Sequence, residues 1–347
     1  MKSLVTGGCG YFGQALVEGL VAAGHEVRVF DLAAPDEPVA GVEYLRADVR
    51  DAGAVAAACR GREFVFHAVA QVPLAKDAEL FWSVNRDGTE NLLRAALESG
   101  ARKVVALSSS AVYGRPVHLP LTEDSSPSPM EEYGRAKLAG EALCREYASR
   151  GLDVVVLRPR TVLGRGRLGI FQILFEWVYR GAPVPVLGRG DNRYQFVHAD
   201  DLVDACLKAA AKPGSAFYNC GAERFGTMRQ ALEALCRHAR TGSRVVGVPA
   251  LPALSLMRLT SSLGLSPLGD YHRMYGADIY FDVSRAAREL AWRPRYSNEE
   301  MILESYDWYV RHRDQVLSGG GASAHRSRVR PGVLTLASWL LRLLPAL

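Results

Sequence analysis

The sequence predicts an α/β protein with a doubly wound parallel sheet and a smaller second domain. Short apolar runs alternate with amphipathic helical segments over the first two-thirds of the chain. Strands that are apolar throughout and alternate with helices are typical of a parallel sheet covered on both faces. A glycine-rich turn also joins the first apolar run to the first helical segment. These observations together predict the fold class.

The expected elements follow from this alternation. Strands are predicted at 2–6, 26–31, 43–46, 64–68, 103–108, 153–158 and 216–219, the last of which could rejoin the sheet. Helices are predicted at 14–23, 52–59, 82–98, 133–149, 171–180, 200–211, 228–238 and 299–312. The segment 249–276, rich in Pro, Leu and Ser, has no assignment.

Two domains are expected from this order. Residues 1–165, with a returning segment at about 190–222, are predicted to form the sheet domain. Residues at about 166–189 and 223–315 are predicted to form a discontinuous substrate domain. We expect this second domain over the carboxyl edge of the sheet, where ligands bind in such folds.

The end of the chain differs in composition. Residues 316–331 are predicted to be a flexible linker because SGGGAS occupies 318–323. Residues 332–347 read as an apolar helix, too short at about 1.5 Å per residue to cross a bilayer. With Arg326, Arg328 and Arg330 before it, 326–347 is predicted to contact a membrane surface peripherally. The alternative is docking on its own domain or on a partner subunit.

Composition excludes several classes of protein. Hydrophobic residues make up 48% and charged residues 23%, as in ordinary soluble globular proteins. The net charge of +5 is concentrated in local basic stretches, so nucleic acid is not expected as a partner. Six scattered cysteines lack zinc-ligand spacing, which predicts no metal and a reduced, cytoplasmic protein, with the inner membrane face as an alternative location.

The glycine turn predicts a dinucleotide site. Gly7, Gly10 and Gly13 follow the first strand as GxxGxxG, with Tyr11 and Phe12 inside the motif. Such glycines make a tight turn, let backbone N–H groups approach a pyrophosphate, and pack the helix on the sheet. This is the arrangement of a Rossmann domain.

An acid at the end of the second strand predicts which dinucleotide binds. Asp31 lies about 20 residues beyond the glycines, where a carboxylate accepts hydrogen bonds from the adenosine ribose hydroxyls. The same carboxylate would repel a 2′-phosphate. NAD is therefore favoured over NADP.

A second motif predicts proton transfer. Tyr133 and Lys137 lie at i and i+4, which places a phenol and an ammonium on one helical face. A free phenol has a pKa of about 10, and a nearby ammonium is expected to lower it. Ser108, Ser109 and Ser110 follow the fifth strand, where a hydroxyl can hydrogen-bond a substrate oxygen.

These motifs together resemble the extended short-chain dehydrogenase/reductase family, over roughly residues 1–315. That family includes NAD-dependent epimerases and dehydratases and 3β-hydroxysteroid dehydrogenase-like enzymes. The resemblance implies a general acid/base at Tyr133, a lysine at Lys137 that also binds the nicotinamide ribose, and a catalytic hydroxyl at Ser109, five residues before the glycine of VYG. It further implies cofactor contacts from the glycine motif and from Tyr11, Phe12, Asp31, Asp48, Val49, Ala68, Val69, Ala70, Asn85, Ser108, Tyr133, Lys137 and Pro159.

Departures from the family pattern narrow the reaction. Ser110 and Ala111 stand where the 4,6-dehydratase branch has an acidic pair, so we do not expect dehydration. Epimerisation or alcohol–ketone oxidoreduction is left. Substrate contacts are predicted from Ser110, from Thr161 (an asparagine in nucleotide-sugar enzymes) and from Arg193, one residue before the usual arginine position. His198, in a motif of the second domain, is expected mainly to cap a helix.

Three functional hypotheses remain open. The first is an epimerase or dehydrogenase of a nucleotide-activated sugar. The second is a dehydrogenase or ketone reductase of a hydroxylated lipid, because LRPR at 157–160 is similar to steroid-dehydrogenase-like branches. The third is a non-catalytic NAD-binding scaffold. By analogy with the family, a homodimer is expected through the helices at 82–98 and 133–149.

Overall fold

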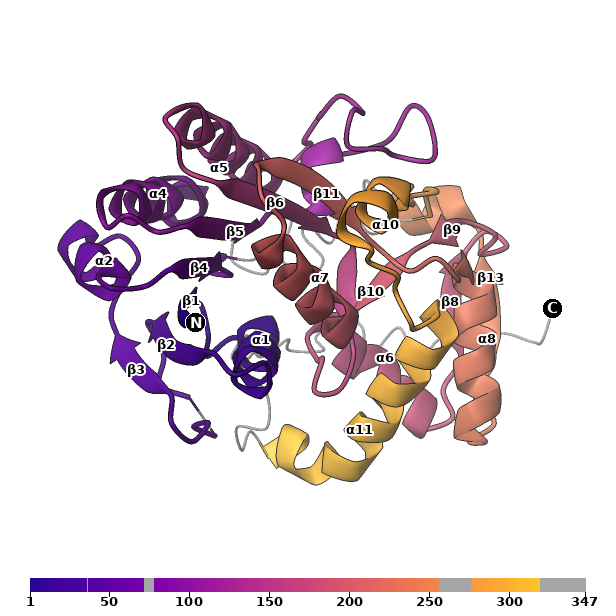
Figure 1. The fold of residues 1–347 in the computed structure, drawn as a ribbon. Coiled ribbons are helices and arrows are strands. Elements are labelled where there is room, and N and C mark those ends of the chain that lie inside the picture. The colour runs from indigo at the N-terminus through magenta and orange to yellow at the C-terminus, as the bar shows by residue number, and fades with distance from the viewer. Residues whose placement is uncertain (36, 72–77, 256–275, 319–347) are drawn as a thin grey trace. The chain divides into compact units, whose positions relative to one another are not determined.

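The computed structural model describes residues 1–35, 37–71, 78–255 and 276–318 (Figure 1). The predicted tail helix and the basic residues before it lie outside this range, as does most of 249–276. The first of two compact units contains Met1–Val162, Val197–Glu223 and Phe281–Arg295. The second contains Leu163–Phe196 and the described residues of 224–280 and from Tyr296 onward.

A seven-stranded parallel sheet forms the centre of the first unit (Figure 1). Its strand order is β11-β6-β5-β4-β1-β2-β3, so successive strands run outward in both directions from the β1–β4 pair. In open sheets of this kind, ligands bind outside the carboxyl ends of the strands where the order reverses. The strands are β1 (Lys2–Thr6), β2 (Glu26–Asp31), β3 (Glu43–Arg46), β4 (Phe64–His67), β5 (Lys103–Leu107), β6 (Val154–Pro159) and β11 (Ala216–Cys220).

Helices cover both faces of this sheet (Figure 1). On one face, α1 (Tyr11–Ala22) packs beside α7 (Ala199–Ala211). On the other, α2 (Ala52–Cys59), α4 (Gly88–Glu98) and α5 (Glu132–Ser149) pack in sequence, and their apolar sides form one core with the central strands. The doubly wound α/β fold predicted from the sequence is confirmed.

The helix predicted at 82–98 is wrong as one continuous element. The chain instead forms α3 (Ala78–Trp82), a π-helix η1 (Ser83–Asp87) and then α4. The N–H of Gly88 bonds the carbonyl oxygen of Ser83, five residues earlier. A π turn holds one residue more than an α turn, and such turns are frequent at functional sites.

The second unit is built mainly from α6 (Ile170–Tyr179), α8 (Met228–Ala239) and α11 (Asn298–Ser318). Their buried faces meet around Phe175, Leu235 and Tyr309. Parallel strands β8 (Val184–Leu187) and β13 (Val245–Val248) pair, as do antiparallel strands β9 (Arg193–Tyr194) and β12 (Gly226–Thr227). Strands β7 (Thr161–Leu163) and β10 (Phe196–His198) form a further pair.

Several predicted boundaries are corrected. Residues 163–165 and 190–196, assigned to the sheet domain, belong to the second unit. Phe281–Arg295, assigned to the substrate domain, belongs to the first unit, because α10 (Ser284–Leu290) packs against β11. Residues 316–318, assigned to the linker, are the last residues of α11. Within the described part of the chain, no helix is long and apolar enough to cross a bilayer.

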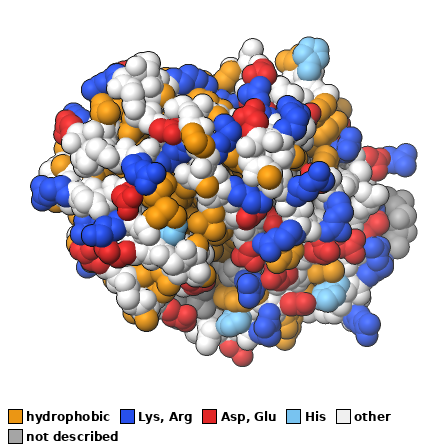
Figure 2. Space-filling view, viewed as in Figure 1, with side chains coloured by type: hydrophobic (Ala, Val, Ile, Leu, Met, Phe, Trp, Pro, Cys, Tyr) orange, Lys and Arg blue, Asp and Glu red, His pale blue; other side chains and the backbone are white. Residues whose placement is uncertain are grey.

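The described surface carries charges of both signs. On the face shown in Figure 2, Lys and Arg side chains are interspersed with Asp and Glu. Exposed ion pairs among the described residues include Arg102 with Glu63 and Arg224 with Glu300. Exposed pairs of this kind contribute little to stability.

Candidate active site

Close backbone packing shapes the glycine turn after β1. Gly7 has a φ of +77°, and a Cβ there would lie 2.7 Å from the backbone nitrogen of Val69. A Cβ on Gly13 would overlap the carbonyl oxygen of Gly7. At Gly10, by contrast, the nearest atom to a Cβ would be that same oxygen, at 3.3 Å. Gly10 precedes α1 without a side-chain cap, so the N-terminus of this helix suits a phosphate.

Asp31 is fixed at the carboxyl end of β2, beside this turn. Its Oδ2 accepts the N–H of Cys9 at 2.9 Å, and its Oδ1 accepts the N–H of Ala33 at 2.9 Å. Carboxylate oxygens have further lone pairs, so the group can also accept ribose hydroxyls. Tyr11 and Phe12 are the first two residues of α1.

Asp48 and Val49 follow β3 and are held by different contacts. The guanidinium of Arg50 bonds the Asp48 carboxylate and holds its pKa below the usual value. The Val49 side chain is buried, and a Cβ on Gly88 would lie 2.5 Å from its Cγ1. The Val49 side chain therefore belongs to the core.

The loop after β4 is tied to the π-helix. The side-chain amide of Asn85 makes two hydrogen bonds to the backbone of Gln71. Its Oδ1 accepts the Gln71 N–H at 3.0 Å, and its Nδ2 donates to the Gln71 carbonyl oxygen at 3.1 Å. The N–H of Ala68 bonds the carbonyl oxygen of Thr6 at 2.9 Å. The structure thus brings Asn85, the loop 68–71 and the end of β1 together.

Helix α5 presents Tyr133 and Lys137 on a buried face that also carries two glycines. A Cβ on Gly134 would lie 2.6 Å from the carbonyl oxygen of Ala111, in the 3₁₀ helix η2 (Ser110–Tyr113). A Cβ on Gly140 would lie 3.0 Å from the carbonyl oxygen of Asn85. The glycines therefore let α5 pack closely on η2 and η1.

The Tyr133 ring lies in an apolar environment. It meets the Phe81 ring edge-on, with centroids 6.2 Å apart and an interplanar angle of 65°. Ala111 and Ala136 complete this small cluster, and Tyr133 is 9% exposed. Edge-to-face contacts of this kind orient aromatic rings.

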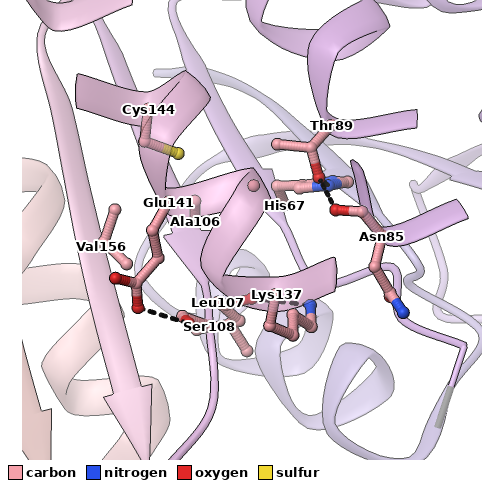
Figure 3. A pocket seen from close by; sticks show the side chains of 11 residues that line it. His67, Asn85, Thr89, Ala106, Leu107, Ser108, Lys137, Glu141, Cys144 and Val156 are labelled. Atoms are coloured by element: carbon pink, nitrogen blue, oxygen red, sulfur yellow. Dashed lines mark hydrogen bonds between the residues drawn. The ribbon is translucent and has the colours of Figure 1, made fainter. Parts of the chain in front are cut away.

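Lys137 is buried next to a small cavity of about 20 Å³ (Figure 3). Its Nζ donates to the carbonyl oxygen of Leu107 at 3.0 Å. Burial lowers the pKa of Lys137 to about 8. The other walls combine polar side chains (His67, Asn85, Thr89, Ser108 and Glu141) with apolar ones (Ala106, Leu107, Cys144 and Val156).

The three serines after β5 have different environments. Ser108 is buried and donates to Oε1 of Glu141 at 2.6 Å (Figure 3). Ser109 is half-buried and caps η2, where its Oγ accepts the N–H of Ala111 at 3.2 Å. An accepted bond leaves the Ser109 hydroxyl proton available to a substrate. Ser110 is the first residue of η2.

Sequence reasoning did not identify a buried ionic network that is bonded to Ser108 through Glu141. Arg158 donates to Glu141 through Nε at 2.8 Å and through a terminal nitrogen at 2.6 Å, and both side chains are 1% exposed. Arg158 also donates to the hydroxyl of Tyr113 at 2.6 Å, which donates to Asn219 at 2.9 Å. An arginine within an apolar strand was the available signal, because buried charges require partners.

The remaining residues that the sequence motifs singled out lie on different strands and helices. Pro159 ends β6 opposite Cys220, and Thr161 begins β7. Arg193 belongs to the second unit, where its guanidinium lies over the ring of Tyr280 at 4.3 Å. His198 caps α7, since its Nδ1 accepts the N–H of Asp200 at 3.1 Å.

Comparison with known proteins identifies the family. A family model described as "NAD dependent epimerase/dehydratase family" matches residues 3–221, more than half of the chain. The protein belongs to this family. The resemblance predicted from the motifs is thereby confirmed.

This epimerase/dehydratase family member is similar to enzymes of two kinds. The chain is 30% identical over 367 residues to a 3 beta-hydroxysteroid dehydrogenase/Delta 5-->4-isomerase of Mycobacterium tuberculosis. That match covers 95% of this chain and 96% of the relative. The chain is also 30% identical over 329 residues to a UDP-glucose 4-epimerase of Mycolicibacterium smegmatis, covering 89% and 98%. Among solved structures, MoeE5 in complex with UDP-glucose and NAD matches with a TM-score of 0.73 and 26% identity, covering 90% and 99%.

Proposed function

We propose that this protein is an NAD-dependent oxidoreductase that epimerises or oxidises a secondary alcohol of a nucleotide-activated sugar. One observation carries the proposal. Tyr133 and Lys137 share a buried face of α5, with Lys137 bonded to the last residue of β5 and Ser109 just beyond it. This set matches what proton transfer from an alcohol requires.

The residues around the glycine turn fit NAD. The N-terminus of α1, which follows Gly10 and has no side-chain cap, suits the pyrophosphate. Asp31 offers oxygens to ribose hydroxyls, and its charge disfavours a 2′-phosphate. NAD is therefore preferred over NADP. Bound NAD supplies the hydride acceptor for the substrate carbon.

The chain's own residues handle the proton. The phenolic oxygen of Tyr133 takes the proton of the substrate hydroxyl and returns it in the reverse direction. The ammonium of Lys137, one turn along α5, favours the phenolate form needed for this step. The Ser109 hydroxyl donates a hydrogen bond to the substrate oxygen and holds it near Tyr133.

Dehydration is not part of the proposal. Elimination of water needs an acid and a base on the substrate, and Ser110 and Ala111 carry no group suited to either role. Ala111 is buried against Tyr133 and Phe81. Simple oxidoreduction and epimerisation need only the Ser109, Tyr133 and Lys137 set.

The choice of a sugar substrate is supported by relatives. The UDP-glucose 4-epimerase relative matches 89% of this chain, and the UDP-glucose complex of MoeE5 matches 90%. The 3 beta-hydroxysteroid dehydrogenase relative supports a second candidate, a hydroxylated lipid. The two candidates share the same proton chemistry and differ in what holds the rest of the substrate.

A turnover assay separates these candidates. The purified protein is incubated with NAD and either UDP-glucose or a 3β-hydroxysteroid, and products are followed by NADH absorbance and chromatography. The proposal predicts a C4 epimer or an oxidised sugar from the nucleotide sugar. Oxidation of the steroid without any reaction of the nucleotide sugar would contradict the sugar substrate and support the hydroxylated lipid.

We also propose that two copies associate through α4 and α5, which pack side by side on one face of the sheet. Sedimentation velocity at micromolar concentration should then give a dimer. A monomer under those conditions would contradict the proposed interface.

Peripheral membrane contact through 326–347 remains our proposal for the apolar tail. The full chain should sediment with anionic liposomes, and a chain ending at Ser318 should stay in solution. Full-length protein that does not sediment with the liposomes would contradict the proposed membrane contact.

A further inference from the structure

A buried chain of hydrogen bonds runs beside the Lys137 cavity. The Oγ1 of Thr6 lies 2.7 Å from Nδ1 of His67, and Nε2 of His67 lies 3.0 Å from Oγ1 of Thr89. The Thr89 hydroxyl donates to the carbonyl oxygen of Asn85 at 2.8 Å. Figure 3 shows Thr89 between His67 and Asn85. All four residues are at most 5% exposed.

Counting protons fixes the direction of every bond in this chain. A hydroxyl has one proton, and Thr89 gives its proton to the carbonyl of Asn85. Thr89 must therefore accept from Nε2–H of His67. A neutral imidazole has no second N–H, so Nδ1 accepts from the hydroxyl of Thr6.

The surroundings keep His67 neutral. Burial, with the Lys137 ammonium nearby as a smaller cause, lowers the pKa of His67 to about 3. Glu141 also lines the cavity, but its carboxylate is bonded to Arg158 and Ser108. The imidazole thus carries its single proton on Nε2 throughout the physiological range.

The chain of bonds ends on the π turn. In this turn the N–H of Gly88 reaches the carbonyl of Ser83, and the hydroxyl of Thr89 bonds the carbonyl of Asn85. Asn85 in turn holds both backbone groups of Gln71, at the end of the loop 68–71. His67 therefore joins the end of β1, just before the predicted glycine turn, to the two predicted cofactor segments that contain Ala68–Ala70 and Asn85.

We propose that His67 is a positioning residue for the dinucleotide site. Its Nε2–H tautomer, held between Thr6 and Thr89, stabilises the π turn that directs the Asn85 amide onto the loop 68–71. The role assigned to His67 rests on the proposed function, because that function names NAD as the ligand.

The tautomer is tested without turnover or cofactor. In the ¹⁵N NMR spectrum of the histidine-labelled full chain, His67 should show a protonated Nε2 and an unprotonated Nδ1. It should not titrate between roughly pH 5 and 9. A proton on Nδ1, alone or in addition to Nε2, would overturn the assignment.

The positioning role is tested by Thr89 variants and a matched histidine control. Thr89→Val removes the hydroxyl and leaves the Asn85 carbonyl and His67 N–H without their partner, so NAD binding should weaken about ten-fold. Thr89→Ser should restore it. The control is His25→Gln: His25 is also buried, and its Nδ1 lies 2.7 Å from Ser3 Oγ near the start of β1. It should lower Tm while leaving the NAD Kd unchanged.

Two results would separate failure of this inference from failure of the proposed function. Thr89→Val with a lowered Tm and wild-type NAD affinity would overturn the positioning role while leaving NAD as cofactor. Absence of NAD binding by the wild-type chain would overturn the cofactor assignment and, with it, the positioning role. In that case the NMR measurement would still decide the tautomer.

Discussion

The ammonium group of Lys137 donates a hydrogen bond to the carbonyl oxygen of Leu107 over 3.0 Å, which ties α5 to the last residue of β5. This bond places the positive charge at the carboxyl edge of the sheet. It also takes the charge out of water, because Lys137 is 5% exposed. The Lys137 ammonium is thus held in a buried position that lowers the free energy of unfolding of the protein.

Lys137→Met should therefore stabilise the protein while removing its activity. The pKa of Lys137 falls from 10.5 to about 8 on burial, which corresponds to about 3 kcal/mol of unfavourable free energy in the ammonium form. Thermal unfolding at pH 7 should show a higher Tm for the variant. Lys208→Met, at a partly exposed lysine, should show little change.

The pH dependence of this difference follows from the same shift. Below about pH 8 Lys137 is charged in both folded and unfolded chains, so the full cost is present. As the pH rises from about 8 towards 10.5, the folded form becomes neutral first and the cost disappears. The stabilities of wild type and Lys137→Met should therefore converge. A constant difference across this range would contradict the burial account.

Glu141→Gln should strongly destabilise the protein. The substitution leaves Arg158 buried without its counter-charge, a loss of about 3–5 kcal/mol for broken buried pairs. Denaturant unfolding measures this loss. Glu146→Gln, at an exposed position on the same helix, is the control and should change the free energy of unfolding by about 0.5 kcal/mol at most. Equal effects of the two substitutions would show that the network contributes nothing.

Gly13→Ala should abolish NAD binding and lower Tm, because the added Cβ would overlap the Gly7 carbonyl oxygen. The control is Gly53→Ala in α2, where the nearest atom to the added Cβ lies 3.4 Å away. This substitution should instead stabilise the helix by about 1 kcal/mol. Isothermal titration with NAD and thermal unfolding provide the two readouts. Normal NAD affinity in Gly13→Ala would mean that the turn has room the structure does not show.

The sheet was predictable because its strands are buried on both faces. Val104, Val105 and Val154–Leu157 are all nearly inaccessible, and such strands read as continuous apolar runs. The glycine turn and the Tyr133–Lys137 spacing were predictable for a similar reason, since each is set by local geometry.

Contacts between distant segments were not predictable in the same way. The π turn inserts one residue into a helix whose apolar pattern continues on both sides, so periodicity does not reveal it. His67 reads as an ordinary strand residue until Thr6 and Thr89 are placed beside it. The return of Phe281–Arg295 to the first unit likewise depends on packing against β11.

Asp31→Ser should weaken NAD binding and reduce the preference for NAD over NADP. The substitution removes the charge that repels a 2′-phosphate and one acceptor of the ribose hydroxyls. The readout is the ratio of Kd values for NAD and NADP, with Glu43→Gln on the neighbouring strand as control. An unchanged ratio would show that Asp31 does not set the preference.

Tyr133→Phe tests the central claim most directly, because it removes one oxygen atom and keeps the ring beside Phe81. With the substrate identified by the turnover assay, kcat should fall by about 10²–10⁴ while the Kd for NAD stays at the wild-type value. Tyr147→Phe, at another buried tyrosine of α5, should keep its activity. Full turnover by Tyr133→Phe would contradict the assignment of Tyr133 as the group that moves the proton.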